Sequence, residues 1–418
     1  MDLDLDNLTA VRVLGKGATG TVFLVADRSP ERSPSAPPFF ALKVVEKFPM
    51  SSSLPTKPDA ERRARWEVSV LARLCHPFLP SLLGRLETAE FLAWAVPYCP
   101  GGDLNALRYS QTDRVFSPSA IRFYVSEIVL ALAHLHSLGI AYRDLKPENV
   151  LIQASGHVTL TDFDLSRFLH RRDSSSSDAD PPLPHVEKAG GHRRRLTRIF
   201  SALPTAQEGR QLTKKKAKSA RVTPASRRST GGKAGVERSH SFVGTEEYVA
   251  PEVVRCDGHE FAVDWWALGI LAYEMAYGRT PFRGRNRKET FRNVVTRQPE
   301  FVGRQPPELT DLIGRLLAKD PARRLGFQGG AEEVKAHPFF CGVQWELLPE
   351  MTRPPFLAPW FEDDEDAAAT PGFIGGGFDL RDYMKKQQQR GEGGRWSWRG
   401  GHGWGHPSRL RSCKYIIS

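Results

Sequence analysis

The stretch "YRDLKPENVL" (residues 142–151) places a carboxylate, an amine and an amide close together. Asp144, Lys146 and Asn149 are offset by two and five residues, and Asp162 follows 13 residues after Asn149. A carboxylate can orient a hydroxyl and receive its proton, and a lysine can screen a phosphoryl group in transfer. An amide and a second carboxylate supply the oxygen ligands that Mg²⁺ prefers. The spacing predicts phosphoryl transfer, with Asp144 and Lys146 catalytic and with Asn149 and Asp162 as metal ligands.

A phosphate-binding segment is expected upstream of these residues. "GKGATGTV" (residues 15–22) lies between two strand-like stretches, where glycines let backbone amides close over phosphates. Taken alone this motif is weak, because glycine turns join many hairpins. Lys43 in "FALKVV" lies on the next strand, as a phosphate-binding lysine would, although such a lysine often only extends to solvent. Glu67 on the following helix can pair with Lys43, the alternative being a plain surface carboxylate.

The elements that would position these residues can be read from periodicity. Residues 8–48 alternate apolar residues and predict strands, and residues 58–74 have helical spacing. Residues 117–139 predict an amphipathic helix with Ser117 as its cap and Gly139 at its end. "NVLIQ" and "HVTLTDF" predict a hairpin, and further helical patterns follow at "DWWALGILAYEMAYG" and "LTDLIGRLLAKD".

Bulk properties indicate an ordinary globular chain. At 418 residues, length alone suggests two to three domains, and a hydrophobic content of 40% with 26% charged residues is unexceptional. The start "MDLDLDNL" is not expected to be a secretory signal, and no apolar stretch approaches the roughly 20 residues that span a bilayer. Five dispersed cysteines without Cys-x-x-Cys spacing argue against a disulfide framework or a zinc site, and favour a reducing intracellular compartment.

One segment supplies the positive excess of the chain. Lys188–Arg238 carries 15 Lys and Arg residues against two Glu, whereas the whole chain has a net charge of +11. Periodicity disappears over about 167–239, and this region is expected to be disordered. Its charge fits nuclear import or attraction to anionic membrane lipid, and a solvated linker is the simplest alternative. Nucleic acid comes last, because no aromatic residues interleave the charge. Thr197 and Thr230, each with Arg at −3 and −2, are sites whose phosphorylation would weaken the attraction.

Several motifs together carry a resemblance to a known family. They are "GKGATGTVFLV", "YCPGGDLN", "AYRDLKPEN", "HVTLTDFDLS" and "FAVDWWALG". Residues 8–340 resemble a eukaryotic protein kinase of the AGC class, and most closely the UNICORN-type members of its plant-specific eighth group. The resemblance implies a serine/threonine kinase that uses ATP and Mg²⁺ in signalling, in plant growth or development. From the cysteines and the basic segment, the chain is expected to be cytoplasmic and nuclear, or associated with the plasma membrane.

The resemblance also implies an α+β bilobal fold with a small β-rich N-lobe and a larger helical C-lobe. The expected divisions are an N-lobe at 8–96, a C-lobe at 97–340 that contains the insertion, an AGC-type tail at 341–384 and a low-complexity tail at 385–418.

By resemblance, adenine stacks between Val22, Ala41 and Leu151 beneath Val96. Pro97 cannot donate a hydrogen bond, but a kinase hinge uses only the carbonyl at this position. Lys43 and Glu67 join the catalytic set. The expected ATP-binding residues are Leu14, Gly15, Lys16, Gly17, Ala18, Gly20, Val22, Ala41, Lys43, Val96, Cys99, Leu151 and Thr161.

Two positions depart from the usual kinase motifs. The metal loop usually ends Asp-Phe-Gly, and "TDFDLS" has Asp164 in the third place while retaining Asp162. Aspartate enters the φ > 0 region less readily than glycine, so Asp164 is expected to stiffen the loop without abolishing chemistry. Tyr142 replaces a histidine at a packing position. The motif fits an active kinase; the alternative classes are a nucleotide-binding scaffold with an inert loop and a membrane or chromatin tether.

Three acids bear on the choice of substrate. At positions matching Asp103, Glu148 and Glu274, basophilic AGC kinases receive arginines two and three residues before the target Ser or Thr. The resemblance therefore implies protein substrates with basic residues at these places, with Thr245 lining the pocket for the hydroxyl. The local alternative is that Glu148 is a loop acid and that Glu274 is a buried helix acid with another partner.

Activation follows from the same resemblance. Arg143 is placed to bind a phosphate on Ser241, or on Ser239 as second candidate, and Arg238 stands three residues before Ser241. The enzyme itself or an upstream AGC-type kinase would add this phosphate. The sequence ends "CKYIIS" without a Phe-x-x-Phe element, so recruitment of that kinase through such an element is not expected. Glu252 is expected to pair with Arg324.

Overall fold

A computed structural model describes most of the region that the motifs occupy. All described residues fall in one compact unit, Met1–His170 with Val236–Ser418, and the second unit, Arg171–Gly235, lies outside them. The predicted disordered insertion beyond residue 169 and the low-complexity tail at 385–418 therefore lie outside the described residues. The described residues are 3–17, 20–28, 39–47, 58–111, 113–169, 245–351 and 377–384.

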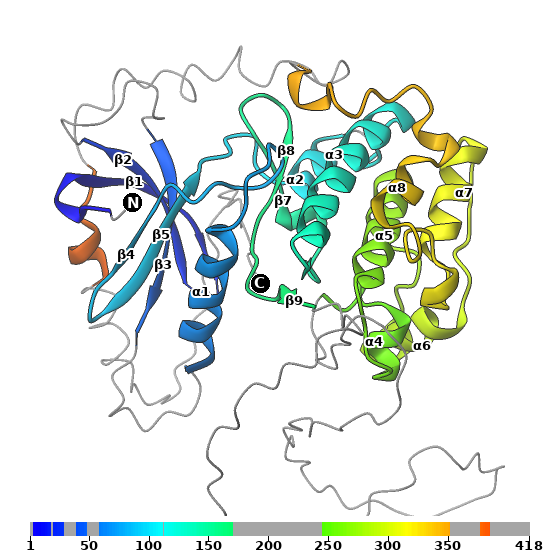
Figure 1. Ribbon diagram of the computed structural model, residues 1–418, viewed down its shortest axis with the longest axis horizontal. Helices are drawn as coiled ribbons and strands as arrows, with labels where there is room; N and C mark the ends of the chain where they lie inside the picture. Colours follow the sequence, from blue (N-terminus) through cyan, green and yellow to red (C-terminus); the bar gives the residue numbers. More distant parts are fainter. Residues whose placement is uncertain are drawn as a thin grey trace, which may run out of the picture. The chain divides into compact units, whose positions relative to one another are not determined.

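A five-stranded antiparallel sheet forms the N-terminal part (Figure 1). Its strand order is β1-β2-β3-β5-β4, and sequence neighbours pair directly except that β5 lies between β3 and β4. The strands predicted over residues 8–48 are confirmed as the first three. The strands are β1 (Leu8–Lys16), β2 (Thr21–Asp27), β3 (Phe39–Glu46), β4 (Gly84–Glu87) and β5 (Phe91–Pro97).

Both faces of this sheet are covered. Helix α1 (Pro58–Leu71) contacts β3 and β5 on one face. A helical turn at residues 380–384 packs on the other face, where Leu380 and Met384 join Phe23 in one buried cluster. Phe378 also forms a bridge with Ala10 of β1, so this tail segment lies beside the first strand although it comes late in the sequence (Figure 1).

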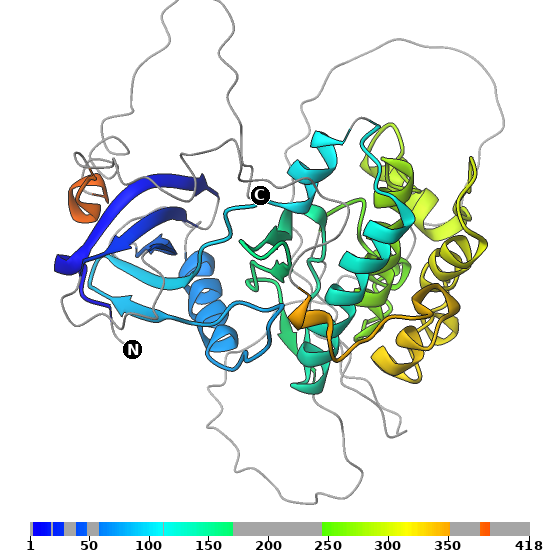
Figure 2. The same cartoon turned by 90° about the horizontal axis from the view of Figure 1, so that it is seen from above.

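The C-terminal part is helical (Figure 2). Ser117 caps α3 by accepting a hydrogen bond from the Ala120 amide at 3.2 Å, as its sequence predicts. Helix α5 is nearly all apolar and packs against α3 and α7, which makes it the centre of the largest hydrophobic cluster. The helices are α2 (Leu104–Ser110), α3 (Pro118–Ser137), α4 (Pro251–Arg255), α5 (Ala262–Tyr277), α6 (Arg287–Thr296), α7 (Pro307–Leu316) and α8 (Gly330–Lys335).

Two short strand pairs carry the catalytic motifs. Strand β7 (Val150–Ile152) pairs with β8 (Val158–Leu160) as the predicted hairpin, with Asn149 just before it and Asp162 just after it. Strand β6 (Ile140–Ala141) pairs with β9 (Arg167–Phe168). The α+β fold class is confirmed, while the exact domain boundaries remain a prediction. Within the described ranges, no helix combines the length and apolarity needed to span a bilayer.

Candidate active site

Lys43, Glu67 and Asp162 meet although they come from three separate elements. Lys43 Nζ donates to Glu67 Oε2 at 2.7 Å and to Asp162 Oδ1 at 3.1 Å. The register of the sheet sets Lys43 opposite Val22 on β2 and Trp94 on β5, and its Nζ lies 5.4 Å from the centre of the Trp94 ring. The structure therefore contains the predicted Lys43–Glu67 pair and adds Asp162 to it.

The electrostatics of this cluster favour a protonated lysine. Burial lowers the pKa of Lys43, but Asp162 and Glu67 outweigh burial, and the net effect raises the pKa above its ordinary value. For Glu67, burial dominates and raises the pKa to about 7 despite Lys43. The raised pKa of Lys43 favours the charged form of the pair, whereas the raised pKa of Glu67 favours its neutral form. Because the 2.7 Å distance is that of a charge-assisted bond and a second carboxylate adds to it, we take the pair as ionised.

Asp144, Lys146 and Asn149 form a second buried cluster. Asp144 Oδ2 accepts from Lys146 Nζ at 3.0 Å and from Asn149 Nδ2 at 2.9 Å. Asn149 Nδ2 also donates to the Asp144 carbonyl at 2.9 Å, which fixes the amide so that its oxygen is directed away from Asp144. Burial raises the pKa of Asp144, with the Lys146 ammonium opposing the shift.

A buried aspartate that the sequence reading missed holds this loop. Asp264, at the start of α5 and fully buried, accepts from the amides of Tyr142 at 2.9 Å and Arg143 at 2.7 Å, and bonds His136 at 2.8 Å. Arg143 has a φ of 72°, a strained value for a non-glycine residue that these bonds stabilise. The signal was present in "AVDWWALG", since an acid within an apolar run needs a buried partner.

The metal loop places its unusual residue differently from the sequence-based expectation. Asp162 has a φ of 60°, whereas Asp164 is not among the described non-glycine residues with positive φ. This conformation therefore does not require glycine in the third position, and stiffening by Asp164 stays a prediction. Asp164 Oδ2 instead accepts from Arg63 of α1 at 3.3 Å. Tyr142 is buried, contacts the Phe163 ring and donates to the Thr161 carbonyl, as a packing residue would.

The residues present fit ATP and Mg²⁺. Asn149 bonds Asp144 through Nδ2, so its amide oxygen takes no part in those bonds. Lys43 bonds only Oδ1 of Asp162, which leaves Oδ2 outside that bond. Both oxygens could therefore serve as ligands for Mg²⁺. In the glycine-rich segment, the Gly17 amide bonds the Gly20 carbonyl at 2.9 Å. A Cβ on Gly20 would lie 2.3 Å from the Val44 carbonyl oxygen, so this position excludes a side chain. Ala18 lies outside the described residues.

The predicted adenine contacts share one face of the sheet. Val22 pairs with Lys43, and Ala41 pairs with Val96, so these four side chains are on the same side. Leu151 belongs to β7 and bridges Asp103 at the hinge end of the C-lobe. Of the remaining predicted contacts, Leu14, Gly15 and Lys16 lie at the end of β1, and Thr161 directly precedes Asp162. Burial raises the pKa of the Cys99 thiol to about 12.

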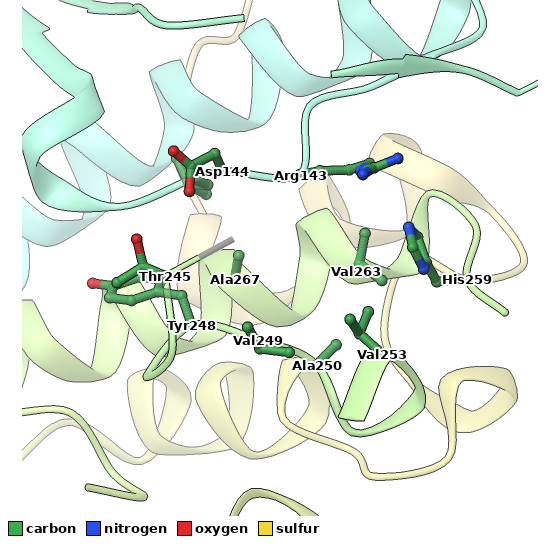
Figure 3. A pocket seen from close by; sticks show the side chains of 11 residues that line it. Arg143, Asp144, Thr245, Tyr248, Val249, Ala250, Val253, His259, Val263 and Ala267 are labelled. Atoms are coloured by element: carbon green, nitrogen blue, oxygen red, sulfur yellow. The ribbon is translucent and has the colours of Figure 1, made fainter. Parts of the chain in front are cut away.

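A small pocket opens beside Asp144. Thr245 and Tyr248 lie at the same end of this pocket as Asp144, while His259 lies at the other end (Figure 3). The pocket is where a hydroxyl could approach Asp144, and Thr245 lines it as predicted. Its remaining lining residues are Arg143, Leu145, Val249, Ala250, Val253, Val263 and Ala267.

The three acids predicted for substrate choice lie close together, but each already has a partner in the chain. Burial raises the pKa of Glu148, and the charges of Glu274 and Asp103 add to the shift. Asp103 caps α2 through the Ala106 amide at 2.7 Å, and Glu148 accepts from an asparagine, Asn105, at 3.1 Å.

Glu274 is the most strongly engaged of the three. It pairs with Arg108 at 3.1 Å and accepts from the Tyr248 hydroxyl at 2.6 Å. These contacts agree with the alternative interpretation, in which Glu274 is a buried helix acid with another partner. The sequence did not predict the pairing of Arg108 with Glu274, because nothing near an arginine in α2 indicates a partner 166 residues away in the chain.

The predicted Glu252–Arg324 pair is present. Arg324 donates from Nη1 and Nη2 to the two carboxylate oxygens at 2.7 and 2.9 Å, and both side chains are almost completely buried. The candidate phosphorylation sites Ser241 and Ser239 lie outside the described residues, as do Thr197 and Thr230.

Comparison with known proteins agrees with this geometry. Residues 8–181 and 225–340 match the protein kinase domain. The chain belongs to the protein kinase family. It is 54% identical over 393 residues to the serine/threonine-protein kinase UCN of Arabidopsis thaliana, with 92% of this chain and 91% of the relative covered. It is 55% identical to UCNL of the same plant over 92% and 89% of the two chains, and 43% identical to the rice protein kinase PINOID over 83% and 68%.

These similarities confirm the resemblance to UNICORN-type AGC kinases. The protein is a serine/threonine-protein kinase, which transfers the γ-phosphate of ATP to a Ser or Thr hydroxyl and uses Mg²⁺ as cofactor. The alternative of a scaffold without catalysis is therefore set aside.

Proposed function

We propose that Asp144 is the residue that orients the substrate hydroxyl and accepts its proton. Its carboxylate is buried beside a small pocket that Thr245 also lines, and burial raises its pKa, which makes it a better base near neutral pH. Lys146, 3.0 Å away, would screen the charge of the phosphoryl group in transfer. The observation that carries this assignment is the Asp144–Lys146–Asn149 cluster at the pocket.

The other assignments follow from the second cluster. Lys43, held by Glu67, would bind the phosphates of ATP, and Asn149 and Asp162 would hold Mg²⁺. Bound Mg²⁺ would neutralise charge that develops on the phosphate oxygens. The glycine-rich segment would close over the phosphates with its backbone amides.

Phosphate transfer from Mg-ATP to an Arg-Arg-x-Ser peptide tests the role of Asp144. Asp144→Asn is expected to lower kcat by about a hundredfold or more, with little change in affinity for ATP. Asp257→Asn, at an exposed acid outside the site, is the matched control and is expected to retain activity. Transfer by Asp144→Asn at the rate of the control would refute the assignment.

We also propose that the kinase prefers basic residues before the target Ser or Thr. Asp103, Glu148 and Glu274 bring three carboxylates together, and Arg108 offsets one of them. The cluster therefore keeps an acidic excess that a substrate guanidinium can pair with. Peptides with Ala in place of each Arg in turn are expected to have a KM raised about tenfold or more, and Glu148→Gln is expected to reduce that discrimination. Equal KM values for all peptides would refute the preference.

For the basic segment Lys188–Arg238, we propose a role in localisation to the nucleus or to anionic membrane. The support is its excess of 13 positive charges, each of which contributes attraction to an anionic surface. Replacing Thr197 and Thr230 by Glu is expected to shift a fluorescent fusion toward the cytoplasm, whereas replacement by Ala is not. The same distribution for both variants would argue against this role. Separately, we propose that Ser241 carries an activating phosphate and that Arg143 binds it.

A further inference from the structure

The carboxylate of Asp164 is directed at helix α1. Its side chain is only 8% exposed, and Oδ2 accepts from Arg63 Nη1 at 3.3 Å. Arg63 precedes Glu67 by four residues, so the two side chains lie one helical turn apart on the same face of α1. The metal loop and α1 are therefore joined by two parallel links, Glu67–Lys43–Asp162 and Arg63–Asp164.

A third contact lies between these two on the helix. Trp66 Nε1 donates to Ser166 Oγ at 3.1 Å, and Ser166 Oγ donates to the Phe163 carbonyl at 2.6 Å. The Trp66 ring also packs edge-on against Phe168 at 5.3 Å. One face of α1 thus holds residues 162–168 at successive points, and moving the helix outward would break all of these contacts together.

Arg63 reduces the negative excess of this contact from two charges to one. Three carboxylates, Glu67, Asp162 and Asp164, face two cations, Lys43 and Arg63. Without Arg63, the buried Asp164 carboxylate would repel Glu67 across the contact. A glycine in place of Asp164 would remove this repulsion together with the link.

We propose that Asp164 is a positioning residue for phosphoryl transfer, because through Arg63 it holds α1 where Glu67 can pair with Lys43. The residue that replaces the usual glycine thereby adds an ionic link between the metal loop and the helix. This inference rests on contacts within the chain and is independent of the proposed substrate preference.

A double-mutant cycle of Arg63→Gln and Asp164→Asn tests the link. Arg63→Gln is expected to lower kcat/KM for ATP by about three- to tenfold while leaving the KM for the peptide unchanged. Adding Asp164→Asn is expected to recover part of that loss, since it removes the carboxylate that Arg63 compensated. Arg65→Gln is the matched control, because Arg65 lies on the same helix and pairs only with Glu61 and Glu87 among the described residues.

Two further measurements separate positioning from general stability. Amide exchange over residues 60–71 is expected to be faster in Arg63→Gln than in Arg65→Gln, at similar melting temperatures. Arg63→Lys, which keeps the charge, is expected to retain most of the activity. If Arg63→Gln fails to fold, Asp164→Asn alone serves as the test variant, because it weakens the link from the other side and is expected to lower kcat/KM for ATP. Equal kcat/KM for ATP in the Arg63→Gln and Arg65→Gln enzymes would overturn the proposal. The proposal would also be overturned if the losses of kcat/KM in the two single variants simply multiplied in the double variant.

Discussion

At the scale of single residues, Asp264 shows how one buried carboxylate fixes a catalytic loop. Its two oxygens take three donors, two of which are the consecutive amides of Tyr142 and Arg143 that lead into Asp144. No water can replace these bonds, because the side chain is completely buried. The position of Asp144 therefore depends on a residue about 120 places later in the sequence.

Asp264→Asn is expected to reduce both stability and activity. An amide presents one acceptor oxygen, and its NH₂ group would face a backbone N–H, so the free energy of unfolding should fall by about 2–4 kcal/mol. The kcat should fall as well, because Asp144 loses its support. Thermal unfolding and peptide phosphorylation measure the two effects.

Asp311→Asn is the control for this change, since Asp311 also bonds a histidine, His337, but is half exposed. If both variants unfolded at the same temperature and had the same kcat, the role given to Asp264 would be wrong.

The sequence predicts that Asp144, Lys146 and Asn149 lie together, because their motif is local. Asp144, Lys146 and Asn149 lie within six residues, so their spacing alone specifies one loop. The contacts that were missed join residues about 100 or more places apart, as in Arg63 with Asp164 and Arg108 with Glu274. Which arginine meets which acid depends on the packing of helices, and the sequence of neither segment carries that information.

At the scale of elements, α5 and α7 approach closely at Gly269. A Cβ on this glycine would lie 2.8 Å from Leu316 Cβ and 2.9 Å from Leu317 Cδ2. Gly269→Ala is expected to cost about 1–3 kcal/mol of unfolding free energy, because the two helices must move apart.

Gly314→Ala in α7 provides the contrast. A Cβ there would meet its nearest neighbour, Phe301, only at 4.0 Å, and alanine favours a helix, so a gain of about 0.5–1 kcal/mol is expected. Denaturant titration measures both changes, and a Gly269→Ala protein as stable as Gly314→Ala would contradict this account of the packing.

A histidine–glutamate contact ties α3 to the hairpin of β7 and β8. Glu127 of α3 bonds His157 Nδ1 at 2.5 Å and accepts from the Val158 amide at 2.8 Å. Burial lowers the pKa of His157, but the bond and charge of Glu127 outweigh it, and the net direction is upward. The imidazole therefore keeps its proton to higher pH when folded than when unfolded.

Stability from this contact is accordingly lost as pH rises. The contribution should be complete below the ordinary histidine pKa of about 6.5 and disappear as pH passes the raised value. The difference in unfolding free energy between wild type and His157→Gln is expected to be larger at pH 6 than at pH 9, by about 1 kcal/mol. Denaturant titrations at the two pH values measure it, and a constant difference would show that the proton plays no part.

Helices and strands were predicted most accurately where a single local pattern determines the element. The cap at Ser117 and the apolar spacing after it are sufficient to place α3, and strand alternation places β1, β2 and β3. The sequence predicted the tail only by resemblance, as an AGC-type segment that wraps the small lobe, and did not predict which face of the sheet it covers. Alternation in β1 and β2 shows that one face is apolar but not which segment covers it.

At the scale of the whole molecule, the tail segment at 377–384 completes the N-terminal sheet. Leu380 and Met384 are buried against the face that includes Phe23, and the Tyr383 ring packs edge-on against Phe23 at 5.2 Å. Arg381 adds an ion pair with Asp6 at 2.7 Å. Residues near the two ends of the sequence therefore share one surface of the small lobe.

Ending the chain after residue 376 is expected to lower the free energy of unfolding by about 3 kcal/mol, since it uncovers this apolar face. Binding of a dye that reports exposed apolar surface should increase. Ending the chain after residue 384 keeps the segment and serves as the control. Identical melting temperatures for the two shortened chains would show that the segment contributes nothing.

The same contact sets an order of events during synthesis. Strand β5, the last strand of the sheet, ends at Pro97, and the segment that covers Phe23 begins only at residue 377. At a ribosomal rate of about 5–20 residues per second, the segment that covers the sheet is synthesised on the order of tens of seconds after β5. During this interval the apolar face of a newly made small lobe is uncovered, and we expect chaperones to bind it on the nascent chain.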